Sequence, residues 1–323
     1  MPHRRKGAQR VVSLGNTCLD IILSSTDQLP RWNSELIFPE TAWRLGGQGA
    51  NFAIAVTRLG LKPILVSSIG TDDPGNRIRR ELVSSMPINS RFFKRQDSTT
   101  GFSVTLIRDD GERSFLTFLG HQSLFTTKPM LHSLLSNIES GDIVHVSGLY
   151  MLPLLRRELL SVFKQLQKVE VSISFDPGWN PSGFTRIKRR AFYRLLSFID
   201  FYEPNDAELK QLTGETNSQL ALRQLERTFH GVIALKLGPK GSKIIDPSGK
   251  ATYVPCYPTT VADTTGAGDV FDAGFITGVV VNLGLHLSAK LATAAASIAI
   301  SRRGGPSMRF PNWSEVSAVI RRR

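Results

Sequence analysis

The sequence DTTGAGDVFDAGF, residues 263–275, is the most informative stretch of the chain. Its small residues Gly266, Ala267 and Gly268 form a turn that leads into an apolar run, which predicts a helix beginning near Asp269. Small residues let a ligand approach the backbone, and the free amides at a helix N-terminus bind anions. Asp269 then has two interpretations of about equal weight, a helix N-cap and a general base beside a bound phosphate.

Outward from this stretch, short apolar runs rich in β-branched residues alternate with amphipathic helical patterns. The runs are nearly continuous in apolar character, which is typical of strands buried on both faces of a parallel sheet. Helices with a 3.6-residue period between such strands flank the sheet, so the sequence predicts an α/β fold. The expected strands are residues 11–14, 64–69, 143–146, 171–175, 198–202 and 232–237, and the expected helices are residues 49–59, 75–84, 156–167 and 218–229.

Two segments, residues 34–45 and 101–120, break this alternation and read as antiparallel strands. In the second, Asp109, Asp110 and Gly111 separate two alternating runs, which is a strong hairpin signal. Strands of this kind do not fit a parallel sheet. We therefore expect them to form a small β-sheet lid on one edge of the main domain.

The chain of 323 residues carries a formal net charge of +13. About half of this excess lies in residues 1–10 and 321–323, and the remaining basic residues are scattered in pairs. No stretch interleaves several basic residues with aromatic ones, so the charge favours a solvated surface over a nucleic-acid interface. A positive surface also attracts anionic substrates.

The longest apolar stretches, residues 274–285 and 291–300, are shorter than the ~18–20 residues that cross a bilayer. A secretory signal has an apolar core after its basic N-terminal region, and no such core follows the basic first ten residues. Two cysteines make no disulfide framework. We therefore expect a cytoplasmic protein with no membrane partner.

Other polar or glycine-rich segments follow predicted strands or precede predicted helices, and ligands gather beyond the carboxyl ends of strands in open α/β sheets. Residues 46–51 (GGQGAN) precede a helix and expose backbone beside Asn51, although such turns are common. Asp20 and Asp176 follow strands and are suited to sugar hydroxyls, although an exposed turn explains Asp20 as well.

Two further turns have a structural and a functional interpretation. In residues 205–208 (NDAE), Asn205 and Glu208 fit a helix capping box, and they also fit a magnesium site that keeps its waters. Residues 236–241 (KLGPKG) follow a strand and either border a nucleotide or only turn the chain.

Taken together, these segments resemble the ribokinase-like (PfkB-type) family of sugar and nucleoside kinases, from about residue 11 to residue 307. The family's two signatures fall at residues 46–51 and 263–274, with its Asn-x-x-Glu element between them. The resemblance implies a three-layer αβα core with a mostly parallel sheet and a small β-sheet lid. It places the kinase domain at 11–310, lid segments at approximately 24–45 and 90–120, a basic N-terminal tail at 1–10 and a C-terminal helix or tail at 311–323.

The resemblance also implies roles for individual residues. Asp269 would deprotonate the accepting hydroxyl, and the amides of Gly266, Ala267 and Gly268 would stabilise the transferred phosphoryl group of ATP. The implied nucleotide contacts are Asn205, Lys236, Gly238, Gly241 and Thr264, with Mg²⁺ organised through water by Asn205 and Glu208. The implied sugar contacts are Asp20, Gly46, Gly47, Gln48, Asn51 and Asp176. The implied monovalent-cation (K⁺) site is Asp263, Thr265, Gly304 and Ser307.

Departures from the family pattern bear on the substrate. Ribokinases proper carry Lys where this chain has Gln48 and Asn where it has Cys18, and their sugar-binding Glu near residues 147–148 is not found here. These differences argue against D-ribose, while residues 176–180 (DPGWN) are similar to generic sugar kinases of the family. A nucleoside kinase and a sugar-acid kinase are the alternatives, and a non-catalytic regulator with a kinase fold is a weaker one. A homodimer through the lid is expected, because the lid often mediates dimerisation in this family.

Overall fold

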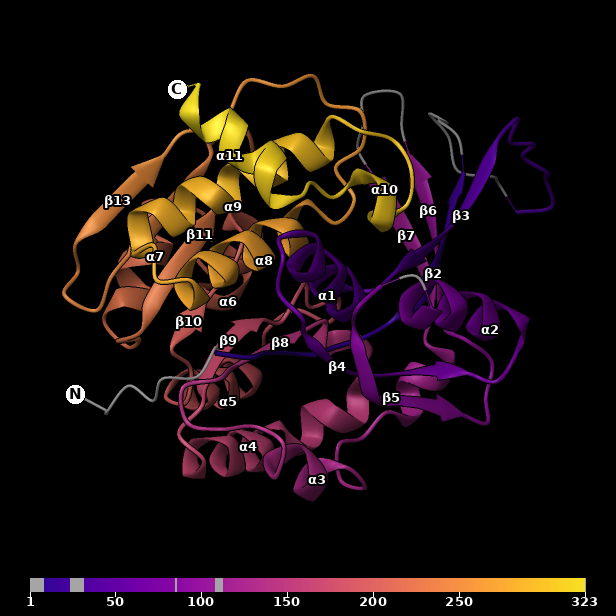
Figure 1. The fold of residues 1–323 in the computed structure, drawn as a ribbon, viewed down its shortest axis with the longest axis horizontal. Coiled ribbons are helices and arrows are strands. Elements are labelled where there is room, and N and C mark those ends of the chain that lie inside the picture. The colour runs from indigo at the N-terminus through magenta and orange to yellow at the C-terminus, as the bar shows by residue number, and fades with distance from the viewer. Residues whose placement is uncertain (1–8, 24–31, 85, 108–112, 323) are drawn as a thin grey trace.

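A nine-stranded sheet forms the centre of the molecule (Figure 1). The computed structural model describes residues 9–23, 32–84, 86–107 and 113–322. All neighbours from β5 to β11 are parallel, and β12 and β13 extend one edge in antiparallel pairing. The strand order reverses between β1 and β8, which is where open α/β sheets bind ligands. In spatial order the strands are β13 (Ala251–Val254), β12 (Ser242–Ile245), β11 (Val232–Lys236), β10 (Phe201–Tyr202), β9 (Ser172–Asp176), β8 (Ile143–Ser147), β1 (Val11–Leu14), β4 (Ile64–Gly70) and β5 (Asn89–Gln96).

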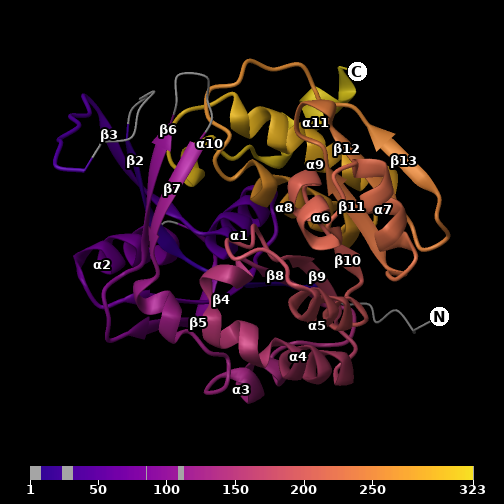
Figure 2. The same cartoon turned by 180° about the vertical axis from the view of Figure 1, so that it is seen from behind.

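Helices cover both faces of this sheet, which confirms the predicted α/β fold with three layers (Figures 1 and 2). One buried cluster joins the sheet to α1 (Gln48–Arg58), α2 (Asp73–Arg79), α8 (Ala267–Val280), α9 (Leu285–Ile300) and α11 (Trp313–Arg321). The other joins it to α3 (Leu131–Leu135), α4 (Pro153–Lys168), α5 (Arg186–Leu196), α6 (Asp206–Thr213) and α7 (Ser218–Glu226). Shorter helical turns are Arg80–Ser84, Gly120–Leu124, Leu149–Met151, Gly238–Lys240 and α10 (Pro306–Arg309).

The helices α8 and α9 are in close contact because glycines leave room between them. A methyl group on Gly274 would lie 2.7 Å from Ala292 Cα, and one on Gly278 would lie 2.6 Å from Ser288 Oγ. Close packing at these glycines fixes the position of the helix that begins with the small-residue turn.

A second, four-stranded sheet, here called the lid sheet, has the order β3 (Thr41–Gly46), β2 (Cys18–Leu23), β6 (Phe102–Ile107) and β7 (Arg113–Phe118). The predicted hairpin is confirmed by the antiparallel β6–β7 pair, while its turn residues 109–111 lie outside the described residues. The predicted lid boundaries are corrected in two places. The lid sheet includes β2, which leaves β1 through a short turn, and β5 belongs to the large sheet because it pairs in parallel with β4. Residues 24–31 of the predicted lid are not described.

The predicted elements differ from the structure at several boundaries, among them the following three. The strand expected at residues 198–202 keeps only Phe201–Tyr202, because the amides of Phe198 and Ile199 bond back to the end of α5. The helix expected at 75–84 starts at Asp73 and ends in a π-helical turn at Arg80–Ser84. The strand expected from residue 34 begins only at Thr41.

The segment expected as a C-terminal helix or tail contains a helix that packs on the core, and residue 10 of the expected N-terminal tail is bonded to the main domain. In α11, Val316 is fully buried against the core, so the segment from residue 311 is part of the folded body. Arg10 donates its amide and its Nε to the Asp142 carboxylate at 2.9 and 3.0 Å, and residues 1–8 lie outside the described part. Among the described residues, we find no helix with the length and apolar character needed to cross a membrane.

Candidate active site

Two cavities meet at the carboxyl ends of the central strands. The large cavity has a volume of about 830 Å³ and the small cavity about 200 Å³. Gln48, Thr265, Gly266 and Asp269 line both of them. The segment that stood out in the sequence therefore forms the wall between a cavity of typical ligand-site size and a smaller one.

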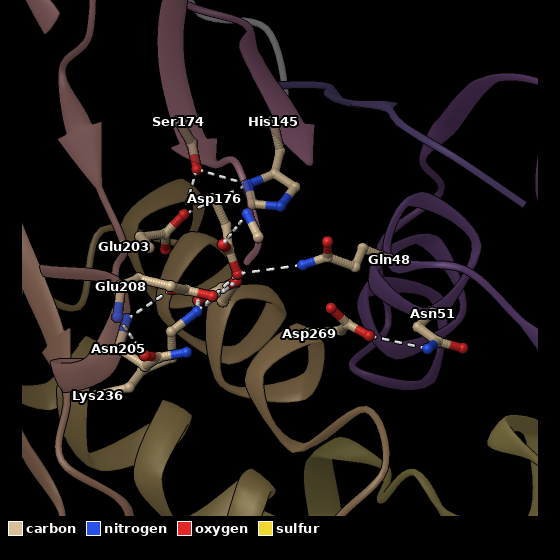
Figure 3. Close-up of polar contacts among 12 residues, drawn as sticks. Gln48, Asn51, His145, Ser174, Asp176, Glu203, Asn205, Glu208, Lys236 and Asp269 are labelled. Atoms are coloured by element: carbon tan, nitrogen blue, oxygen red, sulfur yellow. Dashed lines mark hydrogen bonds and ion pairs between the residues drawn. The ribbon is translucent and has the colours of Figure 1, made fainter. Parts of the chain in front are cut away.

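Asp269 is the third residue of α8 and is only 7% exposed. Asn51 Nδ2, from the first turn of α1, donates a hydrogen bond to Asp269 Oδ2 at 2.8 Å (Figure 3). Burial raises the pKa of Asp269 to about 7, and the hydrogen bond from Asn51 partly opposes that rise. A carboxyl group with a pKa near neutrality is suited to accept a proton from a bound alcohol.

The turn before Asp269 has the form expected of an anion-binding helix N-terminus. Gly266 caps α8 with φ +72°, a left-handed conformation that favours glycine, and a methyl group there would lie 3.4 Å from Asn51 Nδ2. A methyl group on Gly268 would lie 3.5 Å from Lys236 Nζ. Of the three predicted anion-binding amides, that of Ala267 already donates to the Thr264 carbonyl at 3.2 Å.

One face of the lid sheet forms a wall of the small cavity. This face carries a row of four polar residues, one from each strand, that lie opposite one another: Arg44 on β3, Asp20 on β2, Ser103 on β6 and Thr117 on β7. The Ser103 and Thr117 hydroxyls are 3.0 Å apart, and these two residues and Asp20 line the small cavity. Burial raises the pKa of Asp20 to about 6. Asp20 is thus a strand residue of the lid sheet rather than an exposed turn acid.

The opposite wall of the small cavity comes from the glycine loop and α1. Gly47, Gln48 and Asn51 line the cavity, as the sugar-contact prediction requires. Gly47 has φ +95°, and a methyl group there would lie 2.6 Å from the Asn16 carbonyl oxygen. Gly46 does not line the cavity. It packs against the Asp20 carboxylate, which a methyl group on Gly46 would overlap.

Sequence reasoning missed several residues of the small cavity. Asn16 Oδ1 accepts a hydrogen bond from the backbone N–H of Gln48 at 3.0 Å, and Asn16 Nδ2 donates one to Gln122 Oε1 at 2.9 Å. Its position just after β1 would have identified it by the strand-end rule, and strand alternation would have identified Ser103 and Thr117. Gln122 lies in an isolated turn, and no local pattern marks it.

The large cavity holds a buried ion cluster on its floor. Lys236 Nζ lies 2.7 Å from Asp176 Oδ2 (Figure 3). It also lies 3.0 Å from Asp272 Oδ1. Although burial opposes both shifts, the facing charges raise the pKa of Lys236 and lower that of Asp176. Asp176 therefore lies with Lys236 in the large cavity and not with Asp20, although Gln48 Nε2 reaches it at 3.5 Å.

A polar network lies beneath this ion cluster. His145 stacks on Phe52 with ring centroids 3.8 Å apart, and its Nδ1 lies 2.7 Å from Ser174 Oγ and 3.3 Å from Glu203 Oε2. His145, Glu203 and Asp272 bring possible metal-ligating atoms within 4.8 Å of one another. Since Lys236 and Ser174 already engage this group, we interpret it as a structural network.

The capping-box interpretation of the Asn205 and Glu208 motif is confirmed, and the magnesium interpretation stays a prediction. Asn205 caps α6 and the two residues form a reciprocal capping box with both bonds at 2.9 Å, as the structural interpretation predicted. Both also line the large cavity. Burial, with the charge of Asp176, raises the pKa of Glu208 to about 7. A carboxylate and an amide oxygen at the cavity wall fit a water-ligated Mg²⁺.

The rest of the large cavity is mainly apolar and includes the other predicted nucleotide contacts. Lys236, Gly238, Gly241 and Thr264 all line it. The facing wall, which the sequence analysis did not identify, consists of Tyr257, Pro258, Val261, Ala296 and Ile300. An apolar slot next to an anion-binding turn is suited to a nucleotide, with the base in the slot and the phosphates at the turn.

The predicted monovalent-cation residues lie together but are already engaged by arginines. Asp263 Oδ2 lies 2.9 Å from Arg44 Nη1 and 3.0 Å from Arg309 Nη1. Arg309 also donates to the Thr265 carbonyl at 2.9 Å. Gly304 lies beside this group, and the Ser307 side chain is outside the described part. This arrangement does not suit an additional cation.

Comparisons with known proteins agree on one family. A family model described as pfkB family carbohydrate kinase matches residues 8–311. The chain is 24% identical over 322 residues to a ribokinase of Lactococcus lactis, with 97% of each chain covered. It is 26% identical over 316 residues to an ATP-dependent ribose-1-phosphate kinase of Halopiger xanaduensis, covering 97% of this chain and 99% of that protein. The structure of Arabidopsis thaliana ribokinase complexed with ribose and ATP aligns with a TM-score of 0.82 at 24% identity, covering 97% and 99% of the two chains.

Proposed function

This chain belongs to the pfkB family of carbohydrate kinases, and we propose that it transfers the γ-phosphoryl group of ATP to a sugar hydroxyl with Asp269 as general base. The observation that carries the proposal is the position of Asp269, which lines both cavities at their junction. A base at this position reaches an alcohol in one cavity and a terminal phosphate in the other.

The donor binds in the large cavity. Its phosphates lie at the amides of Gly266 and Gly268, close to the positive charge of Lys236, and its base lies in the apolar slot. Mg²⁺, organised through water by Asn205 and Glu208, supplies neutralisation of phosphate charge when bound. Thr264, Gly238 and Gly241 border the nucleotide.

The acceptor binds in the small cavity. The lining combines the carboxylate of Asp20, the amides of Asn51 and Gln48, and hydroxyls from the lid sheet, which together offer donors and acceptors for several sugar hydroxyls. A volume of about 200 Å³, lined mostly by residues with polar side chains, favours a monosaccharide over a nucleoside, whose base needs a further apolar surface. We therefore favour a sugar kinase over a nucleoside kinase and over a non-catalytic regulator.

The chemical step needs one proton acceptor and a site that stabilises negative charge. Asp269 takes the hydroxyl proton as the sugar oxygen attacks the γ-phosphorus, and the bond from that phosphorus to the β,γ-bridging oxygen breaks to release ADP. The amides at the start of α8 stabilise charge on the transferred group. Asn51 holds the Asp269 carboxylate in one orientation through the 2.8 Å hydrogen bond. Binding of the sugar completes this arrangement, which limits transfer to water.

A substrate panel tests the proposal most directly. The purified protein is incubated with ATP and Mg²⁺ and with pentoses, hexoses, sugar acids, sugar phosphates and nucleosides, and phosphorylated products are identified by mass spectrometry. A single class of monosaccharide derivative is expected to react. Turnover of nucleosides alone would replace the sugar assignment, and ATP binding without any turnover would support the regulator.

We also propose a homodimer in which the outer faces of two lid sheets meet. Trp43, Ile21, Val104 and Leu116 lie opposite one another across the sheet, on the face turned away from the small cavity. Trp43 is 48% exposed and Leu116 is 62% exposed. A contiguous, partly exposed apolar row is typical of an association site.

A further inference from the structure

The guanidinium of Arg309 occupies a cage of oxygen atoms next to the anion-binding turn. The side chain is almost fully buried. Its Nη1 lies 3.0 Å from Asp263 Oδ2, and its Nη2 donates to the carbonyls of Asp263, Thr265 and Ala299 at 2.7, 2.9 and 3.4 Å. One carboxylate and several backbone carbonyls form the type of donor set that otherwise binds a hard cation.

The negative charge of the cage is already balanced by arginines, and the cage has no room for an additional cation. Arg44 of the lid sheet adds a second guanidinium 2.9 Å from Asp263 Oδ2, so two fixed positive charges already face that carboxylate. The cavity beside the cage has a volume of about 10 Å³. Its lining includes Arg44, Thr265, Gly304 and Arg309. That is close to the least volume that holds a single water.

We propose that Arg309 takes the place of a monovalent cation, so that this kinase works without K⁺. The inference rests on the proposed function of the Gly266–Asp269 turn. Arg309 is a positioning residue that acts through the peptide between Thr265 and Gly266. In a planar trans peptide the C=O and the next N–H point in opposite directions. Because Arg309 binds the Thr265 carbonyl from one side, the Gly266 amide is directed away from Arg309, toward the cavities that Gly266 lines.

The chemistry of arginine suits this role. A guanidinium stays charged at all physiological pH values and presents several donors in a fixed planar fork, so it engages carbonyls and a carboxylate at the same time. The charge is part of the folded chain and is not subject to exchange with the solvent. Nucleotide affinity and turnover should therefore be independent of the monovalent salt.

The first test uses the wild-type protein with chloride salts of K⁺, Na⁺ and tetramethylammonium at equal ionic strength. Binding of a non-hydrolysable ATP analogue is measured by titration calorimetry, and turnover is measured with the accepted sugar. Both quantities are expected to agree within about twofold across the three salts. Activation or tightening by K⁺ of about tenfold or more over tetramethylammonium would overturn the proposal. The calorimetric arm remains decisive if no sugar is turned over, so failure of the proposed function is distinguishable.

The second test removes the guanidinium. Arg309→Ala in tetramethylammonium is expected to lose about tenfold or more in analogue affinity or turnover, because the Gly266 amide loses its support. K⁺ is expected to restore part of this loss, which a purely structural role would not produce. The matched control is Arg303→Ala, an exposed arginine in the same segment, which should show neither effect. A folded Arg309→Ala protein with wild-type values in all salts would overturn the assignment, and if it does not fold, the wild-type salt series decides.

Discussion

Asn51 Nδ2 donates a hydrogen bond to Asp269 Oδ2 at 2.8 Å and thereby joins the first turns of α1 and α8. The two helices lie against the same face of the large sheet and share one buried cluster. Two segments separated by more than two hundred residues thus place an amide donor and a buried carboxylate at the junction of the cavities. The predictions below follow from this junction and from the groups around it.

Asp269→Asn is expected to lower turnover by about 10²–10⁴-fold while leaving ATP-analogue affinity within a few fold, because the amide cannot accept the substrate proton. Steady-state kinetics and calorimetry measure the two quantities. Circular dichroism before the assay shows that the variant is folded. Near-normal turnover of the folded variant would remove Asp269 from the role of base.

The activity is expected to rise with pH through about 7 and then level off, because the base must be ionised and burial raises the pKa of Asp269 to about 7. The measurement is kcat/KM from pH 5.5 to 9 at constant ionic strength. A flat profile over that range would contradict the assignment.

The same pKa shift predicts a pH dependence of stability with a definite sign. A buried carboxyl whose pKa is raised from 3.8 to about 7 favours the folded state while it is protonated. Its contribution is complete below the unfolded pKa near 4 and is lost as the pH rises through about 7. Asp269→Asn cannot ionise, so its free energy of unfolding should fall less than that of the wild type between pH 5 and 8. Urea unfolding at each pH measures the difference, and parallel pH profiles for the two proteins would contradict it.

Lys236→Met is expected to destabilise the fold by about 3–5 kcal/mol, because it leaves the buried Asp176 and Asp272 carboxylates without their shared cation. Urea unfolding measures the loss. Adding Asp272→Asn to the variant should recover part of it by removing one buried charge. Lys240→Met, on the exposed turn that follows, is the matched control and should change stability little. If the Lys236 and Lys240 variants have equal stability, the ion cluster has no such role.

Gly47→Ala and Gly60→Ala form a matched pair because their φ angles are +95° and +97°. Gly60 has open space around it, so its substitution should cost only the left-handed strain of about 1–2 kcal/mol. A methyl group on Gly47 would also meet the Asn16 carbonyl oxygen at 2.6 Å. Gly47→Ala should therefore be less stable than Gly60→Ala and should raise KM for the sugar. Equal unfolding midpoints with an unchanged KM would contradict the packing argument.

Leu116→Asp is expected to shift the protein from dimer to monomer, because it places a charge in the apolar row on the outer face of the lid sheet. Light scattering after size exclusion gives the mass of each protein at micromolar concentration. Ile187→Asp is the control, since Ile187 is an exposed apolar residue on α5, outside the lid sheet. A monomeric wild type would disprove the dimer.

The large sheet was predictable because its strands are buried on both faces and so carry continuous apolar runs, as in Ile64–Gly70. The strand β10 was harder, because a two-residue strand has too few side chains for a pattern. The lid boundaries depended on pairing partners. Nothing in the sequence of Asn89–Gln96 indicates parallel pairing with β4, so the sequence alone predicts a place in the lid. Likewise, Asp20 was placed in a turn because β2 follows β1 after three residues.

Local sequence determined the parts of the site that lie within one segment: the glycine turn before Asp269, the capping box of Asn205 and Glu208, and the glycine loop before Asn51. Such motifs depend on backbone conformation and on residues a few positions apart, which a single chain records directly. The tertiary structure alone decided which charges face one another. It placed Asp176 with Lys236 instead of with the sugar residues, and it brought Arg44 and Arg309 to Asp263. Electrostatic partners are set by distances in space between segments far apart in the chain, and residue order does not encode those distances.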